Sequence, residues 1–362
     1  QFDFGTPLMI NNQSYKLLTF ISLFTILISC RKKENINYFF STTPYIIELP
    51  SNFPEFESPI DNPLTVEGVE LGRHLFWETK LSGNNSMSCG SCHSPQNAFS
   101  DPNQYSTGIN GDLGKRNSMV LQNLAWANDF FWDGRIISLE EQILMPVMDS
   151  TEMDETWNHF FSEIKYNNEY RRLFYEAFET LEPDSTHAAK AIAQFLRTMI
   201  SSNSKYDRVL NDPSVSFTAE ESAGFDSFNS LTGGDCFHCH GGILGTDFSY
   251  KNNGLDENPV DTGRGLVTGL ANDYYKFKVP SIRNIEYSAP YMHDGRFQTL
   301  AQVIDFYSIG IHPNSPNLDP LIEFSQQGGV GLEPEERTQL IAFLKTLSDS
   351  SFINNPKFSN PH

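Results

Sequence analysis

The pattern C-x-x-C-H constrains this chain more than any other feature, because it occurs twice. It is the attachment pattern of c-type haem. Two thiols three positions apart can both form thioethers with one edge of a porphyrin, and the imidazole that follows can bind the iron. A C-x-x-C pair can also hold zinc, but a His directly after each second Cys favours haem. We therefore predict two covalent haems, held by Cys89, Cys92 and His93 and by Cys236, Cys239 and His240.

The formal net charge of −20 argues against nucleic acid or an anionic membrane surface as a partner. It is compatible with electrostatic steering of a basic protein partner, and equally with ordinary solubility. Four of the five cysteines belong to the haem motifs, so no disulfide framework remains.

The fifth cysteine, Cys30, ends an apolar run of thirteen residues at 17–29 that follows Lys16. That run is too short to span a bilayer and suits a signal peptide. Its ending resembles a bacterial lipoprotein cleavage site. We therefore predict a signal segment at 1–30 with a lipidated Cys30 and a membrane-anchored protein in the bacterial periplasm. A buried strand with a stray thiol is the alternative.

The remaining chain is predicted to be mainly helical. Residues 31–62 are polar and read as a tether or wrapping arm, and a helix at 66–80 leads into the first haem motif. A capping box starts the helix at Ser138, helical segments end with 188–210, and a second capping box at Thr218 starts the helix before Cys236.

The second half repeats the first. The turn ending F-F-W-D-G-R at Arg135 returns as Y-M-H-D-G-R at Arg296, an offset of 161 residues. The F-L-R-T at 195–198 returns as F-L-K-T at 343–346, an offset of 148. The predicted fold is two tandem cytochrome c-like domains, each with one covalent haem. We expect the N-terminal domain at 63–212, the C-terminal domain at 213–350 and a tail at 351–362.

The repeat also indicates how the far side of each haem is filled. Tyr307 falls on Pro146 at the offset of 161 and lies on the inward face of a predicted helix. Its phenol could bind the second iron, whereas Pro146 has no ligating group. A core tyrosine is the alternative, and Met292 and His293 are rival ligands. The loop 94–117 after the first motif contains no His or Met, so the first haem is predicted to be open.

An open haem suits peroxide chemistry, in which a nearby group must move a proton between the two oxygens. Gln142 and Glu152 flank Pro146 in the sequence. Burial near a haem would raise the pKa of a carboxyl group, which suits this role. Either residue could instead be a solvated side chain. Trp132, just before the D-G-R turn, could pass electrons between the haems or simply pack.

Together these motifs resemble the bacterial di-haem cytochrome c peroxidases of the group that includes MauG. The resemblance covers about residues 55–350. It rests on S-C-G-S-C-H, R-N-S at 116–118, F-F-W-D-G-R, L-E-E-Q, Glu-Met at 152–153, D-C-F-H-C-H, F-K-V-P-S-I-R-N at 277–284 and A-P-Y-M-H-D-G-R.

The resemblance implies an oxidoreductase that reduces hydrogen peroxide at a high-spin haem on His93, with electrons from a small redox protein passing through a low-spin haem on His240. Trp132 would lie between the haems, with Gln142 and Glu152 in the distal pocket. It also implies a calcium ion held between the domains by three residues: Asn117, Ser288 and Pro290.

Two departures separate this chain from the ordinary peroxidases of that family. These usually carry a distal His in the loop after the first motif, and a Met where this chain has Tyr307. Both departures are similar to MauG, and they imply oxidation of residues of a partner protein. A homodimer is compatible with the sequence. The competing functions are a non-catalytic di-haem electron carrier and, more distantly, a haem-based sensor.

Overall fold

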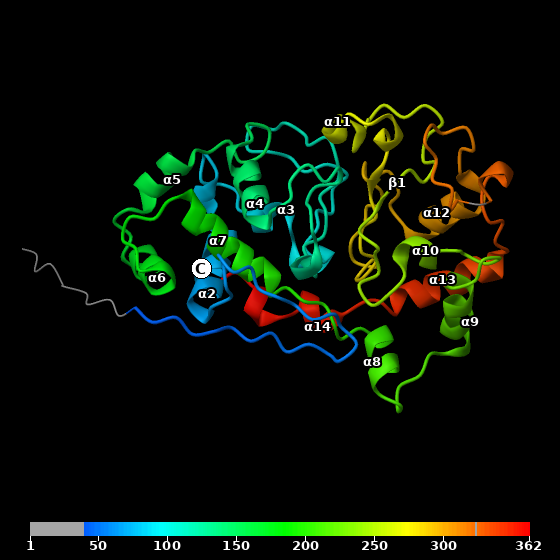
Figure 1. Cartoon of the computed structure of the whole chain (residues 1–362), viewed down its shortest axis with the longest axis horizontal. Coiled ribbons are helices and arrows are strands. Elements are labelled where there is room, and N and C mark those ends of the chain that lie inside the picture. Colours follow the sequence, from blue (N-terminus) through cyan, green and yellow to red (C-terminus); the bar gives the residue numbers. More distant parts are fainter. Residues whose placement is uncertain (1–39, 323) are drawn as a thin grey trace, which may run out of the picture. The chain divides into compact units, whose positions relative to one another are not determined.

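A computed structural model describes residues 40–322 and 324–362 of the chain. The expectations for the signal segment and Cys30 lie outside these residues. Those described are mainly helical, with a single two-stranded antiparallel sheet among them (Figure 1). The sheet consists of β1 (Tyr250–Lys251) and β2 (Phe277–Lys278). No helix in the described ranges is both long and apolar enough to cross a bilayer.

The helices of the first half are α2 (Val66–Phe76), α3 (Cys89–Cys92), α4 (Leu139–Met148), α5 (Trp157–Ile164), α6 (Asn168–Phe178) and α7 (Ser185–Arg197). Those that follow are α8 (Lys205–Asn211), α9 (Ala219–Phe228), α10 (Phe237–His240), α11 (Gly265–Thr268), α12 (Leu300–Asp305), α13 (Pro334–Lys345) and α14 (Ser350–Ile353). A π-helical turn, Phe306–Gly310, continues α12.

Of the two expected capping boxes, the one at α9 is complete and the one at α4 is not. Thr218 and Glu221 form a full reciprocal pair at the start of α9. At α4 the Ser138 hydroxyl does accept from the Glu141 backbone at 3.3 Å. The neighbouring Glu140, however, makes the long-range contact, an ion pair with Arg197 of α7. The expected segment 188–210 is not one helix, because α7 ends at Arg197 and α8 begins only at Lys205.

Each half is organised by one close helix crossing. In the first half, a Cβ on Gly72 of α2 would lie 1.9 Å from the Ala191 carbonyl oxygen of α7. In the second, a Cβ on Gly224 of α9 would lie 1.9 Å from the Gln339 carbonyl oxygen of α13. Only glycine allows two backbones to approach this closely. The two crossings are equivalent, because α7 and α13 carry the repeated F-L-R-T and F-L-K-T segments.

The repeated D-G-R turn has the same geometry in both halves. Phe131 and Met292, at corresponding positions, both adopt a positive φ, of 66° and 75°. In each copy a backbone bridge closes the turn, Phe130 to Ile136 and Tyr291 to Phe297. The prediction of a mainly helical chain built from two copies of one unit is therefore confirmed.

The cores of the two halves are separate, and the arm at 40–62 reaches both. Phe53 is buried, with its ring 5.7 Å from that of Trp126 in the first half. The Arg283 guanidinium of the second half lies 5.3 Å from the same Phe53 ring. The segment expected as a tail also packs inward, because Phe352 and Phe358 belong to the core of the first half.

Candidate functional site

The first C-x-x-C-H motif lies on α3, which Ser88 and Ser91 cap reciprocally. Both of its thiols are free, and burial raises the pKa of Cys89 to about 12 and that of Cys92 to about 11. The Nδ1 atom of His93 lies 2.8 Å from the Phe99 carbonyl oxygen. This hydrogen bond orients the ring and leaves Nε2 for a metal, as is typical of iron-binding histidines.

The second motif repeats this arrangement on α10. The Nδ1 atom of His240 lies 3.2 Å from the Gly245 carbonyl oxygen. Burial raises the pKa of Cys236 to about 12 and that of Cys239 to about 11. Both motifs thus place two protonated thiols beside an oriented imidazole, which are the groups that a c-type haem uses for its thioether links and for its iron ligand.

A large cavity adjoins the first motif. Its volume is about 1150 Å³, and its walls include Cys89, Cys92 and His93. This volume and its partly apolar lining suit a haem with space left beside it. The four residues predicted to surround the first haem all line this cavity: Trp132, Gln142, Pro146 and Glu152.

Glu152 is the titratable group of this set. Burial, and then the charge of Asp149, raise the pKa of its carboxyl group, while the nearby Arg135 lowers it. Sequence reasoning missed Arg135, although it ends the repeated D-G-R turn. Its guanidinium lies 3.6 Å from the centre of the Phe131 ring and pairs with Asp133 at 3.1 Å. Arg135 thus places a positive charge at the cavity wall, close enough to act on Glu152.

Trp132 is buried and hydrogen-bonded to both halves. Its indole Nε1 donates to the Asn117 carbonyl oxygen at 2.8 Å, and its own carbonyl accepts from the Lys278 backbone at 2.8 Å. The Asn117 backbone N–H in turn donates to the His293 carbonyl oxygen at 2.8 Å. A continuous path of hydrogen bonds therefore leads from Trp132 into the second half.

Tyr307 lies in the π-helical turn that follows α12. Burial raises the pKa of its hydroxyl to about 12, although a hydrogen bond from Asn253 lowers it. The Nδ2 atom of Asn253 lies 3.0 Å from the Tyr307 hydroxyl and 3.7 Å from the Met292 sulfur. No sequence motif includes Asn253. His293, the other rival ligand, stacks on Phe277 with ring centres 3.7 Å apart and lines the cavity of the first motif.

The proposed calcium residues lie near the junction of the two halves. The Asn117 side-chain nitrogen donates to the carbonyl oxygens of Asn103 and Gln104, at 3.2 Å each. Its backbone contacts His293, three residues beyond Pro290. Ser288 lies in the same turn, with its hydroxyl 3.5 Å from the Ile285 carbonyl oxygen.

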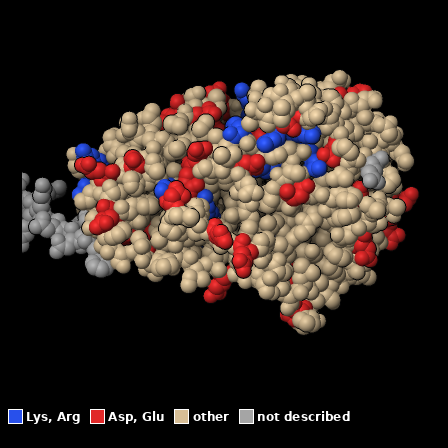
Figure 2. Space-filling model, viewed as in Figure 1, with Lys and Arg blue, Asp and Glu red and all other residues tan. Residues whose placement is uncertain are grey.

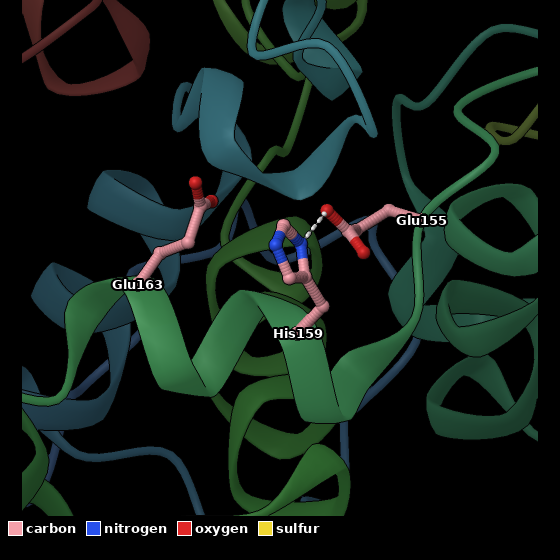
Figure 3. Close-up of side chains that lie close together, drawn as sticks. All are labelled: Glu155, His159 and Glu163. Atoms are coloured by element: carbon pink, nitrogen blue, oxygen red, sulfur yellow. Dashed lines mark hydrogen bonds and ion pairs between the residues drawn. The ribbon is translucent and has the colours of Figure 1, made fainter.

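A cluster of metal-binding residue types lies at α5, with Glu155 just before the helix and His159 and Glu163 on it (Figure 3). The ring of His159 faces Glu155 on one side and Glu163 on the other, with potential ligand atoms within 4.8 Å of one another. Glu155 already binds the His159 Nδ1 at 2.8 Å, and Glu163 accepts from Asn85 at 3.2 Å. The cluster is therefore explained by side-chain hydrogen bonds at the start and near the end of α5.

Charged side chains surround the region between the halves. One gathering of basic side chains lies beside α11, while acidic ones are spread over the same face (Figure 2). Two arginines form ion pairs between separate segments: Arg116 with Asp133 at 2.6 Å and Asp261 at 2.7 Å, and Arg296 with Asp256 at 2.8 Å. These pairs link segments that are distant in sequence.

Comparison with known proteins agrees with these features. The model of the di-haem cytochrome c peroxidase family matches residues 66–214. The chain is 35% identical to the methylamine utilization protein MauG of Methylorubrum extorquens over 292 residues, 80% of each protein. It is 32% identical to the cytochrome-c peroxidase IdrP1 of Pseudomonas sp. over 329 residues, 82% of this chain and 85% of the relative.

A solved structure has a closely similar fold. It is a MauG-like protein associated with microbial copper homeostasis, 33% identical, with a TM-score of 0.81. The match covers 88% of this chain and 99% of that protein. Identity of this level over most of both chains, together with two complete haem motifs, leads to one conclusion: the chain belongs to the family of di-haem cytochrome c peroxidases.

Proposed function

We propose that this protein reduces hydrogen peroxide at a haem bound by His93, with electrons that arrive through a second haem bound by His240 and Tyr307. The observation that carries the proposal is the asymmetry of the two halves. Where the second half has Tyr307, the first has Pro146 on the wall of a cavity of about 1150 Å³. A proline cannot bind iron, so the oxidant has a free position.

A haem held by His93 would supply a redox-active iron for the reduction of peroxide. The surrounding residues act on the protons. Glu152, whose pKa burial raises, is suited to take a proton from the near oxygen and return it to the leaving one. Gln142 offers an amide N–H to orient the peroxide. The net reaction consumes two electrons and two protons and yields two water molecules.

Electrons reach this site through the junction of the two halves. Trp132 is suited to carry them, because it is buried beside the cavity and joined to the second half through Asn117 and Lys278. Tyr307 would bind the second iron as a phenolate, which favours the ferric state. The hydrogen bond from Asn253 would stabilise the negative oxygen.

The reductant in this proposal is a protein. Either a small redox protein donates electrons to the second haem, or residues of a partner protein are oxidised, as the MauG-like ligand pattern favours. We further propose that the protein acts in the bacterial periplasm, held there by a lipid on Cys30, and that calcium binds at Asn117, Ser288 and Pro290.

Electron paramagnetic resonance of the ferric holoprotein tests the proposal. We expect one high-spin signal, which hydrogen peroxide removes, and one low-spin signal, which Tyr307→Phe alters. Met148→Leu, an exposed change on α4, should leave both signals as they are. Two low-spin signals in the resting protein, with no response to peroxide, would establish the non-catalytic electron carrier instead.

A further inference from the structure

Two side chains able to bind iron converge on one hydrogen-bond donor in the second half. The Asn253 Nδ2 atom lies 3.0 Å from the Tyr307 hydroxyl and 3.7 Å from the Met292 sulfur. Both side chains pack in the same apolar cluster, around Leu255 and Phe306. An amide nitrogen carries two hydrogens, so Asn253 can donate to both acceptors at once.

Neighbouring residues hold Asn253 firmly. The buried Asn252 side chain accepts from the Gly254 backbone at 2.9 Å and donates to the Pro316 carbonyl at 2.7 Å. Gly254 has a φ of 77°, and a Cβ there would lie 2.8 Å from Ile311. The backbone on the C-terminal side of Asn253 therefore has little freedom, which helps to position its side-chain amide between the two acceptors.

The repeat distinguishes Met292 from an ordinary core methionine. It occupies the positive-φ position of the D-G-R turn, where the first half has Phe131. Phe131 lines the cavity of the first haem motif. By this correspondence Met292 would face a haem on His240, but it carries a thioether where Phe131 carries a ring that cannot bind metal.

We propose that Met292 is an alternative axial ligand of the haem on His240. It replaces Tyr307 when the iron of that haem is reduced. The inference rests on the proposed ligation by Tyr307. A phenolate is a hard, anionic ligand that suits ferric iron, whereas a thioether is soft and suits ferrous iron. With both side chains beside one iron, the ferric state would have its preferred ligand in Tyr307 and the ferrous state in Met292.

One electron from the reductant converts ferric to ferrous iron. The iron–oxygen bond to Tyr307 breaks, a proton from solvent joins the phenolate oxygen, and an iron–sulfur bond to Met292 forms. Asn253 can keep its hydrogen bond to the Tyr307 oxygen in both states and release the sulfur. The second haem would thus change its affinity for electrons as it receives them.

Nuclear magnetic resonance of holoprotein labelled with ¹³C at the methionine methyls tests this directly. A methyl group bound over a low-spin ferrous haem is shifted far upfield by the ring current. We expect one such resonance on reduction with dithionite, absent in the ferric protein and in Met292→Leu. The control Met148→Leu, with its exposed side chain on α4, should retain it.

A second variant separates this inference from the proposed function. In ferric Tyr307→Phe we expect Met292 to bind the iron, with an altered low-spin signal and a near-infrared sulfur-to-iron band that Tyr307→Phe/Met292→Leu loses. A high-spin second haem in Tyr307→Phe, or no upfield methyl in the reduced wild type, would overturn the role of Met292 alone. An unchanged low-spin signal in Tyr307→Phe would instead overturn ligation by Tyr307.

Discussion

The glycine at the crossing of α2 and α7 allows a quantitative prediction. Gly72→Ala has two opposing effects. Alanine is the better helix former, which stabilises α2 by about 0.5–1 kcal/mol. The new Cβ, however, would lie 1.9 Å from the Ala191 carbonyl oxygen and 2.8 Å from the Phe195 Cβ. The first of these atoms is backbone and cannot rotate away, so the helices must separate.

Overpacking of this kind costs about 1–3 kcal/mol, and the upper end applies here because the contact involves backbone. The net loss should be about 2 kcal/mol, which lowers the Tm by roughly 4–8 °C in a domain of this size. Thermal unfolding of the holoprotein, followed by circular dichroism, measures it.

Two further variants make the comparison sharp. Gly224→Ala should cost about as much, because its Cβ would meet the Gln339 carbonyl oxygen at the same 1.9 Å. Gly114→Ala introduces the same methyl group where the nearest atom is 3.6 Å away, so its Tm should fall much less. A Tm for Gly72→Ala at or above that of Gly114→Ala would refute the reasoning.

Three predictions concern the reaction. Glu152→Gln should lower kcat/KM for hydrogen peroxide about 10²-fold, because an amide cannot exchange the proton, while Glu163→Gln outside the cavity should have no effect in the same steady-state assay. Arg135→Gln should raise the pKa of Glu152, because the Arg135 charge lowers it. The acidic limb of the pH profile of kcat/KM should then move to higher pH, and a move to lower pH would contradict the role of Arg135. Trp132→Phe should slow electron transfer between the haems in stopped-flow reduction yet leave the spectral response to peroxide intact; an unchanged transfer rate would exclude Trp132 from the path.

The sequence predicted those features that are repeated or local. The offset of 161 residues aligned the two D-G-R turns, which do share a bridge and a positive φ. The same offset directed attention to Pro146 and Tyr307, and the structure places Pro146 on a cavity wall and Tyr307 in a buried cluster. Whether each iron is open or closed stays a prediction.

The features that sequence reasoning missed depend on contacts between distant segments. Asn253 belongs to no recognisable sequence motif, and only the fold brings it to Tyr307, 54 residues away. The break between α7 and α8, by contrast, contains the polar stretch 201–204, which the sequence does show. The pairing of Glu140 with Arg197, 57 residues apart, also depends on the fold and has no signal in the sequence around α4.

The packing of Phe352 and Phe358 has a consequence for how the protein is made. Phe99, six residues after His93, has Phe352 and Phe358 as ring neighbours at 5.5 and 6.1 Å. During synthesis the first haem motif emerges more than 250 residues before these two rings. The core beside the first motif is therefore completed only when nearly the whole polypeptide has been made.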